Sequence, residues 1–181
     1  MSLQTHAYGV VILPPPDVLR ELLALRKRHP LLQLPSPPHI TVKSPFYFRQ
    51  TGAAVIEELE TICAAFPPFQ LTLRGLGSFS RSVIFVRVEE SPELRALHEA
   101  VVDGLVGYVE TISDRFEKAN FTAHVTIAEK LIPEDYLAAR SALAGYNPRR
   151  RFRVEEVHLL RGIGGWDITR TFRLGGEPLN P

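Results

Sequence analysis

Two short segments of the chain, His39-Ile40-Thr41 and His124-Val125-Thr126, repeat one pattern of residue types that is suited to proton transfer. In an extended strand, side chains two residues apart lie on the same face, so each histidine shares a face with its threonine. Histidine has an unperturbed pKa of about 6.5, so one ring can accept a proton while the other donates one. The threonine hydroxyls can hydrogen-bond phosphate oxygens as charge develops on them. The pattern therefore predicts one metal-free acid–base site for a phosphodiester.

The residues around these two segments, called here the first and second motif, support a shared role. Apolar and polar residues alternate in the same way in both copies, Pro38-His39-Ile40-Thr41-Val42 and Ala123-His124-Val125-Thr126-Ile127. A threonine in a strand is common, so either motif alone would be weak. Because the alternation is repeated, we expect each motif to be a strand with one face in the core and the other face at the site.

The predicted elements of the chain form two similar series. Strands are predicted at 8–13, 39–43, 69–76, 83–89, 123–128, 152–160 and 166–174, and helices at 16–29, 51–66, 91–105 and 133–144. Thr51 and Ser91 are expected as helix N-caps. The order of strand, helix and strand pair thus occurs twice along the chain.

This repetition predicts an α+β fold for a single domain of residues 1–181. Two pseudo-symmetric lobes are expected at approximately 1–90 and 91–181, each an antiparallel sheet with helices outside. The active-site groove is expected between the two sheets.

The composition is that of an ordinary globular chain, with 181 residues of which 45% are hydrophobic and 23% charged. The formal net charge of +1 argues against a broad cationic surface for nucleic acid. Two basic clusters, Arg26-Lys27-Arg28 and residues 149–153, could meet a phosphate backbone, but a solvated face is the stronger interpretation.

Cys63 is the single cysteine, so an intramolecular disulfide and a zinc site with paired thiolates are excluded. It lies in an apolar helical pattern and is predicted to be a core residue. The apolar stretch 7–13 lacks the basic leader of a signal peptide, and no run approaches the roughly 20 apolar residues of a membrane span. We expect a cytoplasmic protein that has no membrane association and needs neither metal nor cofactor.

On its two motifs and its order of elements, the chain resembles the two-histidine (2H) phosphoesterase superfamily, which includes bacterial 2′-5′ RNA ligases and 2′,3′-cyclic phosphodiesterases. The resemblance covers essentially the whole chain, from Tyr8-Gly9-Val10-Val11 through Gly77-Ser78-Phe79 to the terminal hairpin with Trp166. It is greatest for the YjcG-like branch, on the basis of Pro37-Pro38-His39 and the ending at 166–175.

The resemblance implies that His39 and His124 are the catalytic pair and that Thr41 and Thr126 hold the phosphate. In related cyclic phosphodiesterases the histidine of the N-terminal lobe protonates the leaving ribose oxygen and the other activates water, which makes His39 the acid and His124 the base. The implied activity is hydrolysis of a 2′,3′-cyclic phosphate or 2′-5′ phosphodiester, or ATP-independent 2′-5′ RNA ligation. RNA ends or small nucleotides are the expected partners, and no obligate protein partner is inferred.

One residue departs from the family pattern: Glu129 stands five residues after His124, where many members have arginine. By strand parity, Lys43 and Lys130 share the faces of their motif histidines, so they are candidate substrate-binding cations, with exposed lysines as the alternative. Phe79 is a candidate for stacking on a nucleobase. Core packing is the stronger interpretation for Phe79 as well as for Phe46 and Phe48.

Two other functional classes remain as alternatives to the enzyme. A non-catalytic module could bind an RNA end or nucleotide in the same groove. A metal-dependent hydrolase would need carboxylate or thiolate ligands near the motifs, and His98-Glu99 is not a zinc-protease helix because position 102 is valine. The sequence leaves open the substrate, the direction of the reaction, the effect of Glu129 and the oligomeric state.

Overall fold

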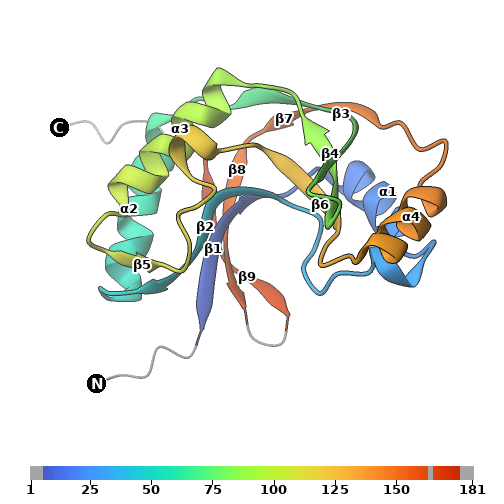
Figure 1. The fold of residues 1–181 in the computed structure, drawn as a ribbon. Helices are drawn as coiled ribbons and strands as arrows, with labels where there is room; N and C mark the ends of the chain where they lie inside the picture. Colours follow the sequence, from blue (N-terminus) through green and yellow to red (C-terminus); the bar gives the residue numbers. More distant parts are fainter. Residues whose placement is uncertain (1–5, 163–164, 176–181) are drawn as a thin grey trace.

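A computed structural model describes residues 6–162 and 165–175, in which four α-helices are assigned, joined to a curled antiparallel sheet (Figure 1). The helices are α1 (Pro16–Arg26), α2 (Gly52–Ala65), α3 (Pro92–Gly104) and α4 (Pro133–Ala142). The strands are β1 (Ala7–Ile12), β2 (Ile40–Phe48), β3 (Phe69–Phe79), β4 (Val83–Val88), β5 (Val109–Thr111), β6 (His124–Ala128), β7 (Arg149–Val154), β8 (Glu156–Gly162) and β9 (Trp166–Arg173). The predicted α+β class is confirmed.

The sheet runs in the order β7-β3-β4-β6-β2-β1-β8-β9, with β5 paired to β2. Its two halves meet at β6 and β2, which share the single residue pair Ile40 and Val125. In Figure 1, α1 and α4 lie together beside the half with β4 and β6, whereas α2 and α3 lie together beside the half with β1 and β2. Helix α2 packs against α3 and β9, and α4 contacts β4. Helices therefore flank the junction where the two motif strands meet.

The halves of the sheet do not follow the lobe division expected near residue 90. Strand β3 pairs with β4 and with β7, while β1 pairs with β2 and with β8. Each half therefore combines strands from before and after residue 90. The strand predicted at 152–160 is in fact two strands, because the chain leaves β7 after Val154 and enters β8 at Glu156 on the other side of the sheet.

The predicted N-caps and the predicted core position of Cys63 agree with the structure. The hydroxyls of Thr51 and Ser91 accept hydrogen bonds from the amides of Ala54 and Leu94, three residues on, as N-caps do. Cys63 is fully buried on α2, and burial raises the pKa of its thiol to about 12. No helix within residues 6–162 and 165–175 has the length and apolar character that crossing a membrane requires.

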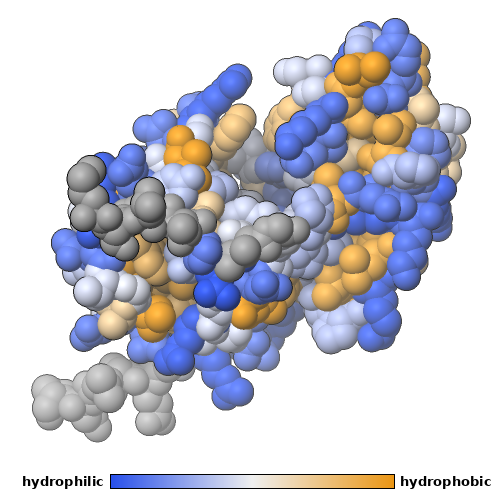
Figure 2. Space-filling model, turned by 90° about the horizontal axis from the view of Figure 1, so that it is seen from below, coloured by the Kyte–Doolittle hydropathy of each residue, from blue (hydrophilic) through white to orange (hydrophobic). Residues whose placement is uncertain are grey.

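Figure 2, a view from below, shows hydrophilic and hydrophobic side chains intermixed over the surface and a hollow between two bulky parts of the molecule. The exposed large apolar residues are distributed over several elements, for example Leu137 on α4 and Ile168 on β9. Scattered single apolar residues are normal on a protein surface. The surface therefore gives less information about function than the junction of the two motif strands does.

Candidate functional site

The two motifs lie side by side at the middle of the sheet because β2 and β6 are neighbours. Ile40 and Val125 pair directly and are both fully buried on one side of the sheet. The flanking histidines and threonines of both motifs are half-buried. Since adjacent residues of a strand point to opposite faces, the four polar side chains share the face opposite the core. Two imidazoles and two hydroxyls are thereby brought together.

Both motif histidines are anchored in the same way. Nδ1 of His39 is 2.7 Å from the carbonyl oxygen of Pro37, and Nδ1 of His124 is 2.7 Å from that of Thr122. A carbonyl oxygen can only accept a hydrogen bond, so Nδ1 donates in each case. In the neutral ring Nε2 then carries no proton and is an acceptor. Each motif thus presents one nitrogen, Nε2, that can take or give a proton.

The surroundings of the two rings favour their neutral forms. Burial lowers the pKa of His39, and the positive charges of Arg26 and His124 lower it further, against the opposing effect of the Pro37 carbonyl. Burial also lowers the pKa of His124, against the effect of the Thr122 carbonyl. The pair Ile40 and Val125 places the two rings on neighbouring strands, on the same face of the sheet.

A groove of about 750 Å³ opens beside the second motif. It is lined by residues from β2, α3, β6, the β3–β4 hairpin and the segments on either side of β6. They include Thr41, Phe79, His98, Arg115, Phe116, Asn120, Phe121, His124, Thr126 and Glu129. His39 is not among the lining residues. Both polar residues of the second motif, His124 and Thr126, therefore line the groove, whereas the first motif contributes Thr41.

Phe79 lies in the groove, at the place where a substrate contact is predicted for it. Its ring meets the ring of His124 edge-on, with centroids 5.1 Å apart, and lies 4.3 Å from the ring of Phe85. Phe79 therefore restricts the orientation of the His124 imidazole. The other aromatic candidates, Phe46 and Phe48, pack with Tyr8.

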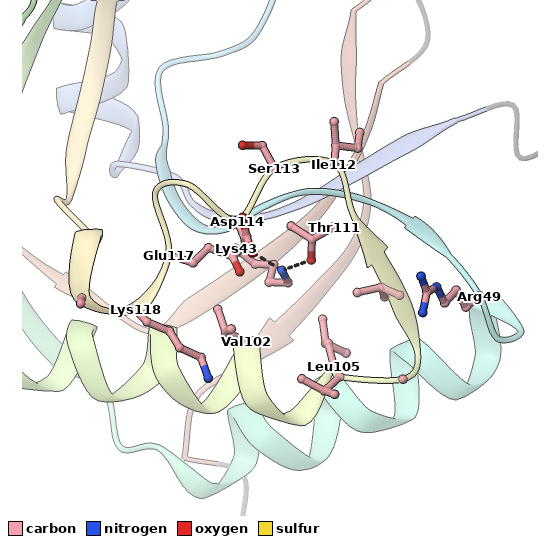
Figure 3. Close-up of a pocket in the computed structure, with 14 residues that line it drawn as sticks. Lys43, Arg49, Val102, Leu105, Thr111, Ile112, Ser113, Asp114, Glu117 and Lys118 are labelled. Carbon is pink, nitrogen blue, oxygen red and sulfur yellow. Dashed lines mark hydrogen bonds and ion pairs between the residues drawn. The ribbon is translucent and has the colours of Figure 1, made fainter.

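Lys43 does not lie in this groove, contrary to the prediction from strand parity. Its side chain is 2% exposed, and its ammonium donates to Glu117 and to Thr111, each at 2.7 Å (Figure 3). The three residues line a different pocket, of about 700 Å³, between α3 and the chain that follows β5. Two register shifts in the pairing of β1 with β2, around the pair Val10 and Lys43, interrupt the alternation on which the prediction depended.

Lys130 is exposed and is not among the residues that line the groove. Strand β6 ends at Ala128, and Lys130 has a positive φ of 58°, so the chain turns before strand parity could carry this side chain back to the face of His124. Glu129, by contrast, lines the groove. The cation expected at its position is therefore not supplied by either lysine.

Residues 112–122, called here the rim segment, form one wall of the groove, and no element is predicted for them from the sequence. Arg115 and Phe116 line the groove from this segment, with the Arg115 guanidinium 5.3 Å from the centre of the Phe116 ring. Phe116 is 60% exposed. The sequence of this segment has neither helical nor strand periodicity. The adjacent arginine and phenylalanine were the signal from which a substrate contact could have been predicted.

Two buried side chains hold the rim segment against β2. Glu117 accepts from the Lys43 ammonium and from the Ser44 amide. His98 of α3 donates from Nδ1 to the Val42 carbonyl at 2.6 Å, accepts at Nε2 from the Lys118 amide at 2.8 Å, and stacks on Phe121. Both ring nitrogens of His98 are engaged, so this histidine is structural rather than a proton carrier.

Arg26 is buried, contrary to the solvated face predicted for its cluster. The side chain is 5% exposed, while its neighbours Lys27 and Arg28 are exposed. Its guanidinium points to the carbonyl groups of Ser36 and Thr126, next to the two motifs. The burial of Arg26 depends on a residue one hundred positions away in the sequence, so local composition could not predict it.

No group of three or more histidine, cysteine, aspartate or glutamate side chains that could hold a metal ion occurs among the described residues. The chemistry that the motifs can perform on their own is proton transfer at two Nε2 atoms, with two hydroxyls beside them. The curled α+β sheet and the paired His-x-Thr motifs define the class of two-histidine proteins.

Comparisons with known proteins agree with that class. A family model described as the 2′-5′ RNA ligase superfamily matches residues 14–166, and the chain belongs to this family. A protein of Bacillus cereus (strain B4264), provisionally named a phosphoesterase, is 31% identical over 172 residues, which are 92% of this chain and 96% of that protein.

Solved structures share the fold at low sequence identity. E. coli LigT complexed with 3′-AMP has a TM-score of 0.66 and 18% identity, over 93% of this chain and 98% of that chain. The protein TT0787 of Thermus thermophilus has a TM-score of 0.64 and 18% identity, over 95% of this chain and 100% of that chain. The assignment to the YjcG-like branch stays a prediction.

Proposed function

We propose that this chain is a metal-independent phosphoesterase that acts on 2′,3′-cyclic phosphates or 2′-5′ phosphodiesters of RNA ends or nucleotides. The observation that carries the proposal is the pair of motif histidines on neighbouring strands, each anchored at Nδ1 by a carbonyl oxygen 2.7 Å away. Family membership supports it, as do the phosphoesterase name of the Bacillus relative and the 3′-AMP bound to E. coli LigT.

In the proposed mechanism, one neutral imidazole takes a proton at Nε2 from the attacking water, or from a ribose hydroxyl in ligation. The other imidazole, protonated, gives its Nε2 proton to the leaving ribose oxygen. Thr41 and Thr126 donate hydrogen bonds to the non-bridging oxygens, where negative charge increases in the transition state. Following the family, His39 is assigned as the acid and His124 as the base.

Arg115 and Phe116 are the proposed contacts for the remainder of the substrate. Arg115 is a cation in the groove lining and supplies the positive charge that Glu129 does not. Phe116 is exposed at the rim and Phe79 lies beside His124, so a nucleobase can stack on either ring. A phosphate near the motifs with its base toward the rim would satisfy both charge and stacking.

The test uses wild type, His39→Ala and His124→Ala with 2′,3′-cyclic nucleotides and RNA that ends in a cyclic phosphate, each in EDTA. General acid–base groups contribute about 10² or more, so each variant is expected to lose at least that factor in kcat. His29→Ala is the matched control. His29 is not among the residues that line the groove, and its Nδ1 accepts a hydrogen bond from the nearby Leu31 amide. Turnover within about threefold of wild type for either motif variant would refute the site.

The same panel separates the enzyme from a binding module. A module would bind these ligands in a calorimetric titration, lose affinity in the two motif variants, and release no product from any substrate. The enzyme is expected to yield product from at least one of them.

A further inference from the structure

Arg26, the last residue of α1, is a buried cation that none of the proposed catalytic steps uses. It is 5% exposed, and its Nε is buried without a hydrogen-bond partner. Burial lowers the pKa of its guanidinium to about 10, and the negative charge of Glu129 opposes this effect. Arg26 therefore remains positively charged at neutral pH.

The guanidinium connects the two motif segments. Nη1 donates to the carbonyl of Ser36, three residues before His39, and Nη2 donates to the carbonyl of Thr126 at 2.8 Å. Strands β2 and β6 share only the pair Ile40 and Val125. The planar fork of Arg26 is thus a second connection across this junction, and its geometry fixes the spacing of the two segments.

The charge of Arg26 is not neutralised by direct contact with a carboxylate. Of the ion pairs found within the described ranges, none includes Arg26, and Glu129 acts on it only at longer range. Burying such a charge is costly, so an apolar side chain would be expected here if packing were the sole requirement. The positive charge instead acts on His39, whose protonated form it disfavours.

We infer that Arg26 is a positioning residue of the two-histidine site, which holds the first and second motifs at their working distance and places a positive charge next to the first motif. This inference rests on the proposed function. The charge acts on one of two rings whose Nδ1 atoms are anchored in the same way.

The test compares Arg26→Met, which removes charge and fork, with Arg26→Lys, which keeps the charge but not the planar fork. Arg28→Met is the matched control, because Arg28 is exposed just beyond the same helix end. Imidazole titrations followed by NMR, assigned with His39→Asn, give the midpoint of each motif histidine without substrate. Steady-state kinetics with a cyclic-phosphate substrate give kcat/KM against pH, and thermal melts establish that each variant is folded.

Arg26→Met is expected to move the His39 midpoint and one limb of the kcat/KM profile to higher pH, because a nearby positive charge has been removed. Arg26→Lys is expected to keep both near their wild-type positions. Both variants are expected to lose on the order of 10-fold to 10²-fold in kcat/KM, because displaced catalytic groups are this costly. Arg28→Met should match wild type.

An unchanged His39 midpoint in folded Arg26→Met would overturn the electrostatic part of the proposal, the effect of the Arg26 charge on His39. A wild-type kcat/KM in Arg26→Lys would overturn the bridging part, the connection of the two motifs by the planar guanidinium. If Arg26→Met does not fold, Arg26→Lys still decides the bridging part, and Arg26→Gln replaces Arg26→Met in the titration. Failure of the proposed function is distinguishable, since a wild type without turnover still reports the His39 midpoint.

Discussion

The buried ion pair of Lys43 and Glu117 gives a quantitative test of how the rim of the groove is held. Its two charged atoms are 2.7 Å apart, and the side chains are 2% and 6% exposed. Glu117→Leu would leave the Lys43 ammonium buried with the Thr111 hydroxyl as its remaining side-chain hydrogen-bond partner. Removing one member of a buried pair costs about 3–5 kcal/mol, since the other charge is left uncompensated. For a chain of this length that corresponds to a fall in Tm of roughly 6–20 °C.

The double variant Lys43→Met with Glu117→Leu removes both charges and fills a similar volume with apolar atoms. It is expected to recover most of the lost free energy of unfolding, because apolar replacement of a complete buried pair is often neutral. The exposed pair Arg74 and Glu89, at 3.1 Å with side chains 60% and 44% exposed, is the control. Glu89→Gln is expected to stay within about 1 kcal/mol of wild type.

Urea unfolding followed by circular dichroism would measure all four proteins, and steady-state kinetics would follow the rim. Glu117 also accepts from the Ser44 amide and so fixes the segment that carries Arg115 and Phe116. Glu117→Leu is therefore expected to raise KM more than it lowers kcat. A single-variant loss below about 1 kcal/mol, the value of an exposed pair, would refute this reasoning. So would a double variant no more stable than Glu117→Leu.

Four further predictions concern the site and the core. Thr126→Val should lower kcat by on the order of 10², as loss of one donor to a developing oxyanion does, whereas Thr126→Ser should keep most activity. Because burial lowers the pKa of both His39 and His124, each ring stays neutral to lower pH, and kcat/KM should peak below pH about 6.5; a peak above about 7.5 would contradict this. Phe116→Ala should weaken nucleotide binding by about 1–3 kcal/mol in calorimetry, and Phe116→Tyr should not. The buried Cys63 thiol should react with a thiol reagent only in denaturant.

Local pattern was sufficient where one strand face is buried. Ile40 and Val125 are fully buried, so their alternation with histidine and threonine determined which side chains share the opposite face. The caps Thr51 and Ser91 were also predictable, because an N-cap accepts a hydrogen bond from an amide only three residues away. Each of these features depends on a few adjacent residues.

The remaining features depend on distant contacts. Lys43 does not lie on the face of His39, where strand parity predicts it, because register shifts between β1 and β2 interrupt the alternation. Arg26 is buried because it reaches the carbonyl of Thr126 from another part of the chain. The rim segment is ordered by Glu117 and His98 through contacts to β2, and no periodicity marks such a segment in the sequence. Strand parity and composition carry no information about these pairings.

The two motifs are alike in sequence, strand position and Nδ1 anchor, so the motifs themselves cannot make one histidine an acid and the other a base. Identical anchors select the same tautomer in both rings. The difference must come from their neighbours, which are not alike: the charge of Arg26 acts on His39, whereas Phe79 and Phe85 lie against the ring of His124. The division of roles is therefore a property of residues outside the motifs. Exchanging the motif sequences between the two strands should leave the roles of the two positions unchanged.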